Sequence, residues 1–189
     1  MSVLLVGGTP GTGKSKVAQV LGSRLSVKVI NLGDLADENE CISAVDKARD
    51  TGVIDEDCLI SAIEEVIDDV KGQIVVEGHY IDLVPFSSVD YVFILRTHPD
   101  ELKKRLSSRD WSKEKIVENV EAEVIGVCQL DAIESFGEEI VFEIDTTDLS
   151  PVQVADEIQR ILKSDEEPER IDWMELLENE GRLDEYLSD

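Results

Sequence analysis

The sequence predicts one α/β domain built on a five-stranded, mostly parallel sheet with helices on both faces. Five short apolar runs alternate along the chain with segments in which apolar residues recur at helical spacing. Strands that alternate with helices favour parallel pairing, because each helix returns the chain to the same end of the sheet. The chain has 189 residues, 42% of them hydrophobic, which is enough for one such core.

The predicted strands are short and apolar, as expected for strands that are covered on both faces. They are residues 2–6, 27–31, 73–77, 89–95 and 140–144. The predicted helices are residues 15–25, 55–71, 99–109, 112–136 and 151–163. Three helix starts carry capping signals: His98 before Pro99, Ser112, and Ser150 with Pro151 and Gln153 behind it.

A glycine-rich segment follows the first strand and opens the first helix. Gly8-Thr9-Pro10-Gly11-Thr12-Gly13-Lys14-Ser15 fits the pattern G-x-x-x-x-G-K-[ST] at every fixed position. Glycines let consecutive N–H groups turn inward toward phosphate oxygens, and the helix that follows presents its positive end to the same anion. Lys14 is expected on the β- and γ-phosphates, Ser15 on Mg²⁺, and Lys16 to add a backbone N–H while its side chain faces solvent.

This motif predicts a P-loop NTPase with a three-layer α/β/α fold that binds ATP and Mg²⁺. A GTPase would need an N-K-x-D segment, which this sequence lacks. An AAA-type ATPase usually ends a strand in two adjacent acids and is larger, whereas here the third strand ends in the single acid Glu77. The small size, the mixed segment after the second strand and the arginines after the fourth therefore favour a small-molecule kinase.

Several segments together resemble the adenylate kinase isoenzyme 6 family. They are GTPGTGKS, NLGDL at 31–35, VVEGHY at 75–80, and ILRTHPDEL at 94–102, followed by R-L, R-D-W-S and K-I-x-E-N-V-x-A-E ending at residue 123. The resemblance covers about residues 1–163. It implies a nucleoside monophosphate kinase domain with a short acceptor flap at about 31–54 and a short lid at about 108–118, leaving 164–189 as an acidic tail.

The resemblance also implies an activity and partners. Members of this family are broad-specificity nucleoside monophosphate kinases with ATPase activity that act in late maturation of the small ribosomal subunit and its 16S rRNA. For this chain it implies ATP and AMP or dAMP as substrates, with the basic ribosomal protein uS11 and the pre-30S subunit as partners. Two alternatives stay open: an assembly factor that hydrolyses ATP with incidental kinase activity, and another P-loop kinase with a sugar-acid or shikimate-like acceptor.

Site residues follow from this resemblance and from the chemistry of phosphoryl transfer, which needs charge neutralisation and positioning. Lys14, Glu77, His79 and Arg109 are the predicted catalytic residues, and Arg109 and Arg105 are expected to contact ATP. Glu77 stands where the family often has aspartate in D-x-H, and it is expected to hold Mg²⁺ through water. Gly33 and Asp34 are the predicted acceptor-binding residues, with Arg49 as a further candidate phosphate ligand.

Each of these assignments has a structural alternative. Glu77 can cap a strand end, His79 can be structural, and Asp34 can be a helix N-cap. Arg105 and Arg109 are four residues apart, so they share a helix face that can equally be a solvated basic surface. Trp111 can stack on a base or anchor the lid.

The chain carries 43 acids against 18 Lys and Arg, for a formal net charge of −25. Residues 165–189 alone hold eleven acids and two bases. Such a charge disfavours strong binding to nucleic acid and suits either a salty cytoplasm or a basic partner. No apolar run approaches the roughly 20 residues that span a bilayer, and the N-terminus shows no secretory signal. The widely spaced Cys41, Cys58 and Cys128 are expected to be reduced thiols in a cytoplasmic protein.

Overall fold

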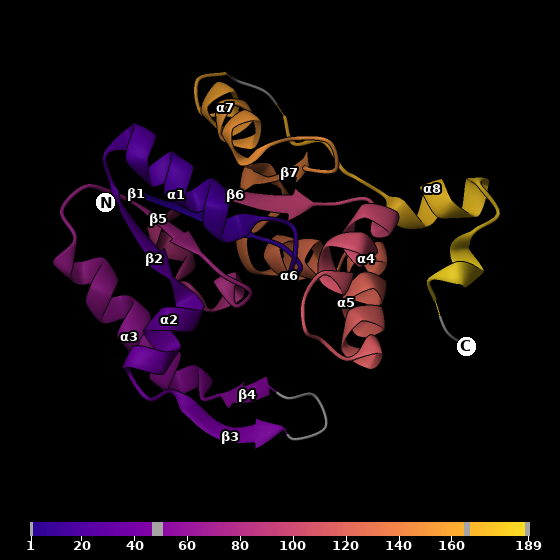
Figure 1. Cartoon of the computed structure of the whole chain (residues 1–189). Coiled ribbons are helices and arrows are strands. Elements are labelled where there is room, and N and C mark those ends of the chain that lie inside the picture. Colours follow the sequence, from indigo (N-terminus) through magenta and orange to yellow (C-terminus); the bar gives the residue numbers. More distant parts are fainter. Residues whose placement is uncertain (1, 47–50, 165–166, 188–189) are drawn as a thin grey trace.

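The computed structural model, shown in Figure 1, describes residues 2–46, 51–164 and 167–187. Its main sheet has five strands in the order β2-β5-β1-β6-β7, and every neighbouring pair is parallel. The strands are β1 (Ser2–Gly7), β2 (Lys28–Asn31), β5 (Gln73–Glu77), β6 (Val89–Arg96) and β7 (Val141–Asp145). The predicted five-stranded parallel sheet is confirmed.

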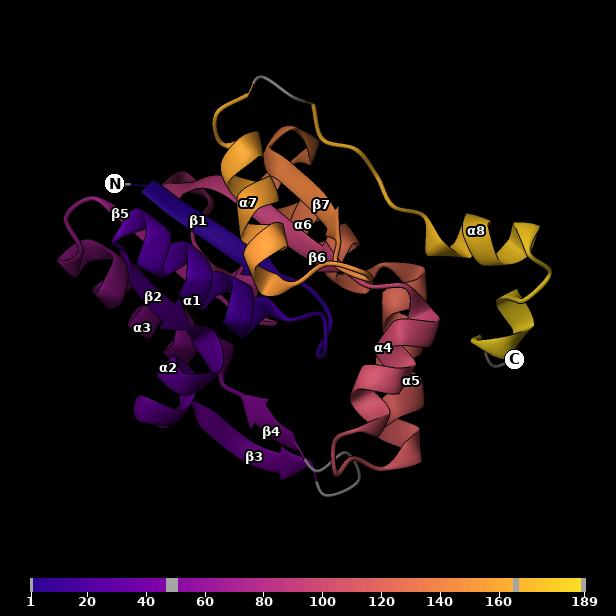
Figure 2. The same ribbon diagram turned by 45° about the horizontal axis from the view of Figure 1, so that its top comes forward.

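Helices cover both faces of this sheet (Figures 1 and 2). The α-helices are α1 (Lys14–Leu25), α2 (Leu32–Glu38), α3 (Glu56–Asp69), α4 (Pro99–Ser107), α5 (Lys113–Ile125), α6 (Val127–Phe136), α7 (Pro151–Ile161) and α8 (Trp173–Asn179). Four short 3₁₀ turns are η1 (Ile81–Leu83), η2 (Phe86–Ser88), η3 (Glu138–Ile140) and η4 (Leu183–Glu185). One core contains buried residues of α1 and α7, and the other contains those of α2, α3 and α6. The three-layer α/β/α arrangement is therefore confirmed.

Strand β1 shows how the sequence supplies both cores. Val3 and Leu5 point into the core beneath α3 and α6, whereas Leu4 and Val6 point into the core beneath α1 and α7. All four side chains are almost completely buried. Alternation along a strand sends successive side chains to opposite faces, so a central strand covered on both sides must be apolar throughout.

The segment between β2 and β5 contains secondary structure of its own. After α2 comes an antiparallel hairpin of β3 (Ile42–Asp46) and β4 (Thr51–Ile54), which projects away from the main sheet (Figures 1 and 2). The sequence predicted a mixed flap here without assigning these elements. Strands of five and four residues are too short to give a pattern that can be assigned from sequence.

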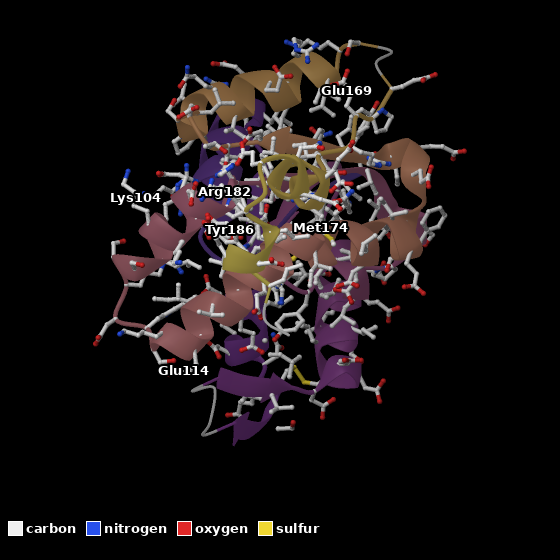
Figure 3. The ribbon with its side chains drawn as sticks, turned by 90° about the vertical axis from the view of Figure 1, so that its right-hand side faces the viewer. Lys104, Glu114, Glu169, Met174, Arg182 and Tyr186 are labelled. Carbon is white, nitrogen blue, oxygen red and sulfur yellow. A yellow bond between two sulfur atoms is a disulfide. The ribbon has the colours of Figure 1, made fainter. Side chains whose placement is uncertain are left out.

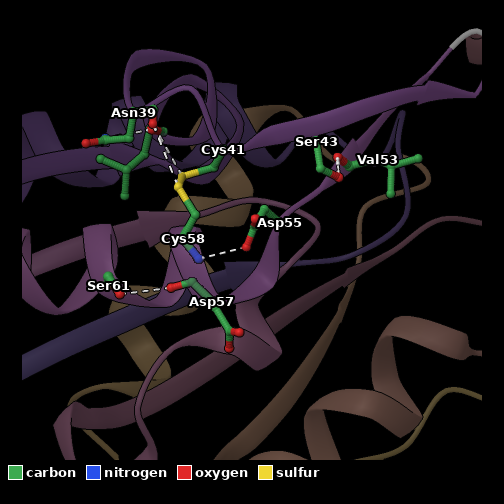
Figure 4. Close-up of a disulfide and its surroundings, with 9 residues drawn as sticks. Asn39, Cys41, Ser43, Val53, Asp55, Asp57, Cys58 and Ser61 are labelled. Atoms are coloured by element: carbon green, nitrogen blue, oxygen red, sulfur yellow. Dashed lines mark hydrogen bonds between the residues drawn. A yellow bond between two sulfur atoms is a disulfide. The ribbon is translucent and has the colours of Figure 1, made fainter.

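A disulfide joins Cys41 at the start of this hairpin to Cys58 in the first turn of α3 (Figure 4). The two Cα atoms lie 5.4 Å apart, within the range that a disulfide needs. The prediction that all three cysteines are reduced is wrong for this pair, because the hairpin folds back and brings together residues 17 positions apart. Cys128 carries a free thiol.

The predicted long helix over 112–136 is two helices. Gly126 adopts a left-handed conformation, with φ of 79°, and is both the C-cap of α5 and the N-cap of α6. The change of direction sends α5 against α4 and α6 under the sheet, so the two helices bury their apolar residues in different cores. The capping predictions are confirmed: His98, Ser112 and Ser150 cap α4, α5 and α7, the last in a capping box with Gln153.

The C-terminal segment docks on α4 and α5 (Figure 3). Leu177 of α8 and Tyr186 are buried against Leu102 and Leu106 of α4 and Val120 of α5. Arg182 adds hydrogen bonds to the carboxylate of Asp100, at 3.0 and 3.1 Å. In the described part of the chain, no helix is long and apolar enough to cross a membrane.

Candidate nucleotide site

The loop between β1 and α1 has a backbone that glycine alone accommodates. Gly8 has φ of 132°, and a Cβ there would stand 2.4 Å from the carbonyl oxygen of Leu95. Gly13, with φ of 101°, is the N-cap of α1 and offers no side-chain acceptor to the first-turn N–H groups. A helix start without a side-chain cap leaves those N–H groups for an anion, as phosphate-binding loops require.

A cavity of about 660 Å³ opens over this loop. Its lining residues come from the loop and α1, from α4, and from the β7–α7 connection. They are Pro10, Gly11, Thr12, Gly13, Lys14, Ser15, Lys16, Val17, Arg105, Ser108, Arg109, Thr146, Leu149, Pro151 and Val154. The structure therefore brings together at one cavity the predicted residues from 10 to 16 and both predicted arginines.

The ammonium group of Lys14 lies inside the loop. Its Nζ donates to the carbonyl oxygens of Gly8, at 2.7 Å, and Thr9, at 3.2 Å. Burial lowers the pKa of Lys14, and the charge of Arg109 lowers it further, while Cys128 and Glu77 act in the opposite direction. Arg109 thus lines the same cavity as Lys14, although it lies just beyond α4 and ninety-five residues further along the chain.

Glu77 ends β5 beside the loop. It pairs in register with Val6 of β1 on one side and with Asn31 of β2 on the other. Its side chain is 2% exposed, and its carboxylate accepts a hydrogen bond from the Asn31 side-chain amide. A buried carboxylate at the carboxyl end of a strand next to the phosphate loop fits the oxygen chemistry that Mg²⁺ prefers, as does the exposed hydroxyl residue Ser15.

His79 lies just beyond that strand, in the turn before η1. Its side chain is exposed, and its Nδ1 lies 3.7 Å from the Sγ of Cys128 on α6. Desolvation lowers the pKa of His79, and the charge of Lys14 lowers it further. Burial of Cys128 raises the pKa of its thiol to about 11, so the thiol is held neutral near this histidine.

The two arginines of α4 and its C-terminal extension differ in how firmly they are held. Arg105 donates to the carbonyl oxygens of Thr146 and Thr147, at 2.9 and 3.0 Å, and pairs with Glu101. Arg109 instead packs its guanidinium over the ring of Trp111, 5.0 Å from the ring centroid. Arg105 therefore also fastens α4 to the β7–α7 connection, whereas Arg109 keeps its polar edge available to the cavity.

Trp111 anchors the segment between α4 and α5. Its ring packs against the core formed by α4, α5 and the C-terminal segment, and Lys115 lies 4.7 Å from its centroid. Arg109, Lys115 and residues of this core therefore already contact the Trp111 ring. The observed contacts favour the anchoring interpretation of Trp111 over base stacking.

The predicted acceptor residues lie at the start of α2, apart from the cavity lining. The N-cap of α2 is Asn31, whose Oδ1 accepts from the backbone N–H of Asp34 at 2.9 Å. The N-cap interpretation of Asp34 is therefore wrong, and its side chain is exposed, as is Gly33. Because Asn31 also donates to Glu77, the start of this segment is joined to the magnesium candidate. Arg49 lies outside the described residues.

Sequence reasoning missed a buried charged cluster behind the loop. Arg96 at the end of β6 is 1% exposed and pairs with Glu123 of α5, at 2.9 Å, and Glu143 of β7, at 2.7 Å. Glu123 in turn accepts from the Thr9 hydroxyl, at 2.6 Å. The signal was present, since Glu123 is the last residue of the K-I-x-E-N-V-x-A-E segment, but nothing in the spacing indicates which distant residues it meets.

The chain is similar to known proteins in sequence and in fold. A family model described as "AAA domain" matches residues 4–126, which run from β1 through the end of α5. Shikimate kinases have a similar fold: one from Bacteroides thetaiotaomicron gives a TM-score of 0.56 at 14% identity, over 86% of this chain and 99% of that one. A second, from Acinetobacter baumannii in complex with shikimate, gives 0.57 at 14% identity, over 87% and 94%. Fold and phosphate loop together define an α/β P-loop NTPase.

Closer relatives are named as adenylate kinases. A "Putative adenylate kinase" of Archaeoglobus fulgidus is 38% identical over 95% of both chains, and one of Methanosarcina barkeri is 36% identical over 92% of this chain and all of that one. The yeast "Adenylate kinase isoenzyme 6 homolog FAP7" is 36% identical over 75% of this chain and 71% of its own length. The chain belongs to the adenylate kinase isoenzyme 6 family.

Proposed function

We propose that this protein is a broad-specificity nucleoside monophosphate kinase that converts ATP and AMP into two ADP, and that it also hydrolyses ATP. The observation that carries the proposal is the cavity in which the phosphate loop and Lys14 face Arg105 and Arg109 of the α4 region. Positive groups contributed by different elements to one cavity can stabilise the charge of a transferred phosphoryl group. The 14% identity to shikimate kinases speaks for the shared fold alone, whereas the closer relatives favour a nucleotide acceptor.

In the proposed reaction, the bond from the γ-phosphorus to the β–γ bridging oxygen breaks, and a phosphate oxygen of AMP forms the new bond. Lys14 neutralises the β- and γ-phosphates from the loop side, and Arg109 does so from the opposite wall. Ser15, through its hydroxyl, and Glu77, through water, are the residues that would hold Mg²⁺. The ion, when bound, shields the phosphate charge.

For ATP hydrolysis we assign His79 the task of orienting the attacking water. The lowered pKa favours the neutral imidazole, which can accept a proton near neutral pH. The contact between its Nδ1 and Cys128 fixes one edge of the ring and leaves Nε2 for the water. In this proposal either a nucleoside monophosphate or a water molecule takes the γ-phosphoryl group. The two activities therefore compete for one site.

We further assign residues 1–163 to the kinase domain, with a flap over 31–54 and a lid over 108–118. Support for the flap comes from its structure, a helix and a hairpin that project from the sheet, with Asn31 joining its start to Glu77. Support for the lid comes from Arg109, which lies at its start and lines the cavity, and from Trp111, over whose ring the Arg109 guanidinium packs. Gly33 and Asp34 are proposed to face the acceptor once the flap closes.

A second candidate function is an ATP-driven assembly factor of the cytoplasm that acts on the pre-30S subunit through uS11. The net charge of −25 favours this candidate, because an acidic surface attracts a strongly basic protein. A pull-down of a uS11 homologue tests it, at low salt and at working salt. Absence of association in both would count against the candidate.

One assay separates the two functions. ADP formation is measured with ATP and Mg²⁺ alone, and then with AMP, dAMP, CMP or UMP added in turn. A kinase forms ADP faster when a monophosphate is added, with AMP or dAMP giving the greatest increase. If no monophosphate raises the rate above that with ATP alone, the kinase assignment fails and the ATPase remains.

A further inference from the structure

The Glu123 carboxylate collects donors from three separate parts of the chain. It is 1% exposed, and its Oε2 accepts from the Thr9 hydroxyl at 2.6 Å. Its Oε1 accepts from Arg96 Nε at 2.9 Å, from the backbone N–H of Thr97 at 3.0 Å, and from the indole N–H of Trp173 at 3.2 Å. One buried carboxylate thus joins the phosphate loop, the end of β6 and the C-terminal segment.

Charge balance alone does not require this arrangement. Arg96 already has a second buried carboxylate, that of Glu143, at 2.7 Å. Its guanidinium also donates to the backbone carbonyl oxygens of Glu123, at 2.8 Å, and Ile171, at 3.1 Å. A buried carboxylate needs donors on both oxygens, and the donor to Oε2 of Glu123 is the Thr9 hydroxyl of the phosphate loop.

The backbone carbonyl of Thr9 binds two later residues of the same loop. Its carbonyl oxygen accepts from the Thr12 hydroxyl at 2.9 Å, from the Thr12 backbone N–H at 3.3 Å, and from Lys14 Nζ at 3.2 Å. Its own hydroxyl is held by Glu123. Because the side chain and the carbonyl belong to one residue, fixing the first restricts the direction of the second, and with it the position of Lys14.

Trp173 brings the C-terminal segment to the same carboxylate. It is the first residue of α8 and is 7% exposed, with His98 packed edge-on at 5.4 Å between ring centroids. The rest of the segment is fastened independently, by Leu177 and Tyr186 in the core with α4 and α5. The indole N–H therefore reaches Glu123 only when this segment is docked.

We propose that Glu123 is a positioning residue that couples the docked C-terminal segment, through Trp173, to the phosphate loop, through Thr9. Docking then favours the loop geometry in which Lys14 meets the transferred phosphate. The coupling rests on the proposed role of the loop in phosphoryl transfer, and it makes the acidic C-terminal segment part of the active enzyme. A partner that displaced this segment would lower turnover without touching the nucleotide.

The test is a double-mutant cycle of Thr9→Val and Trp173→Phe, both of which remove one donor and keep most of the side-chain volume. We expect each single variant to lower kcat, by about tenfold for Thr9→Val and about threefold for Trp173→Phe, with little change in KM for ATP. If both act through one carboxylate, Trp173→Phe has no further effect when Thr9 is already valine. Thr9→Ser restores kcat to within about twofold of wild type. Met174→Leu, next to Trp173 but 38% exposed, is the matched control and leaves kcat unchanged.

A second measurement does not depend on activity. In ¹H–¹⁵N spectra, Trp173→Phe is expected to shift the backbone amides of Thr9 and Thr12, whereas Met174→Leu does not shift them. Unmoved loop amides, or equal effects of Trp173→Phe on kcat with and without Thr9→Val, would overturn the coupling even in an active kinase. Shifted amides in a protein that transfers no phosphate to any monophosphate would instead overturn the proposed function and leave the coupling standing.

Discussion

Lys14 is the residue on which the proposed chemistry depends most. Its ammonium group is held among loop carbonyls, where burial lowers its pKa. A buried charge in that position is costly unless it is paired, and a polyphosphate supplies the pairing. The arrangement suits the proposal that the loop N–H groups and this ammonium bind the same polyphosphate.

We predict that Lys14→Met lowers kcat by about 10²- to 10³-fold, because one preorganised charge opposite the developing phosphate charge is lost. Steady-state ADP formation measures the effect. The control is Lys28→Met, which makes the same change in charge at an exposed position, the first residue of β2. Equal activity of Lys14→Met and wild type would remove the loop from the mechanism.

His79 gives a prediction about pH. Because desolvation and the charge of Lys14 hold its pKa below the usual 6.5, the imidazole is mostly neutral above that pH and becomes protonated in more acidic solution. Wild-type ATP hydrolysis should therefore be level between about pH 8 and about pH 6.5 and should fall below that. His79→Gln should lower hydrolysis about a hundredfold and remove this acid limb, while the affinity for Mg·ATP changes by less than about threefold. An acid limb that persists in His79→Gln would return the residue to a structural role.

Among the elements, the hairpin of β3 and β4 is held to the body by the Cys41–Cys58 disulfide. The hairpin and α2 otherwise contribute few buried residues, with Leu32, Leu35 and Ala36 on α2 as the main contacts. A cross-link of this loop length restricts the unfolded chain and stabilises the fold. The flap proposed to cover the acceptor is thus attached at its start, through Asn31, and at Cys41, through the disulfide to Cys58 of α3.

We predict that reduction of this disulfide lowers the free energy of unfolding by about 2–4 kcal/mol. Denaturant unfolding with and without a thiol reductant measures the difference. Cys58→Ser should lose the response to the reductant, whereas Cys128→Ser should keep it, since Cys128 carries a free thiol. A wild-type protein whose stability is the same in both conditions would contradict the prediction.

The elements also show where sequence reasoning succeeds and where it stops. Strands and capped helices follow from local patterns, so the sheet, His98, Ser112 and the capping box at Ser150 were all predictable. Gly126 was visible but ambiguous, because a single glycine is tolerated inside a helix and only packing against two separate cores decides for a break. The disulfide and the docked α8 depend on contacts between distant segments, which no local pattern contains.

Across the whole molecule the acidic charge is the dominant feature. With 43 acids and 18 Lys and Arg, carboxylates repel one another over most of the surface. Buried or bonded pairs, such as Arg182 with Asp100, relieve a small part of this repulsion. Screening by salt weakens the repulsion that remains between the other carboxylates.

We predict that the melting temperature rises between about 0.1 M and about 1 M KCl, because the Debye length falls from about 10 Å to about 3 Å. Thermal unfolding followed by circular dichroism measures it. A steep rise points to a surface suited to a salty cell. A level or falling melting temperature would show that repulsion costs the folded state little, and would favour a basic partner as the reason for the charge.

The residues of the candidate site come partly from one continuous segment and partly from segments far apart in the sequence. The eight residues of the phosphate loop are contiguous, so a sequence motif identifies them. Glu77 and His79 became candidates because they lie at the end of a predicted strand. Glu123, Arg96 and Trp173 reach the loop from α5, β6 and the C-terminal segment, and only the folded chain brings them together. The residues proposed to contact phosphate were therefore visible in the sequence, whereas the contacts of Glu123, Arg96 and Trp173 were not.

Titration of the ¹⁵N-labelled protein with Mg·ADP tests the central assignment most directly. We predict saturable binding with the largest amide shifts in residues 8–16, centred on Gly13 and Lys14, and loss of those shifts in Lys14→Met. Shifts confined to other parts of the chain, or a loop that does not respond to saturating nucleotide, would contradict the account.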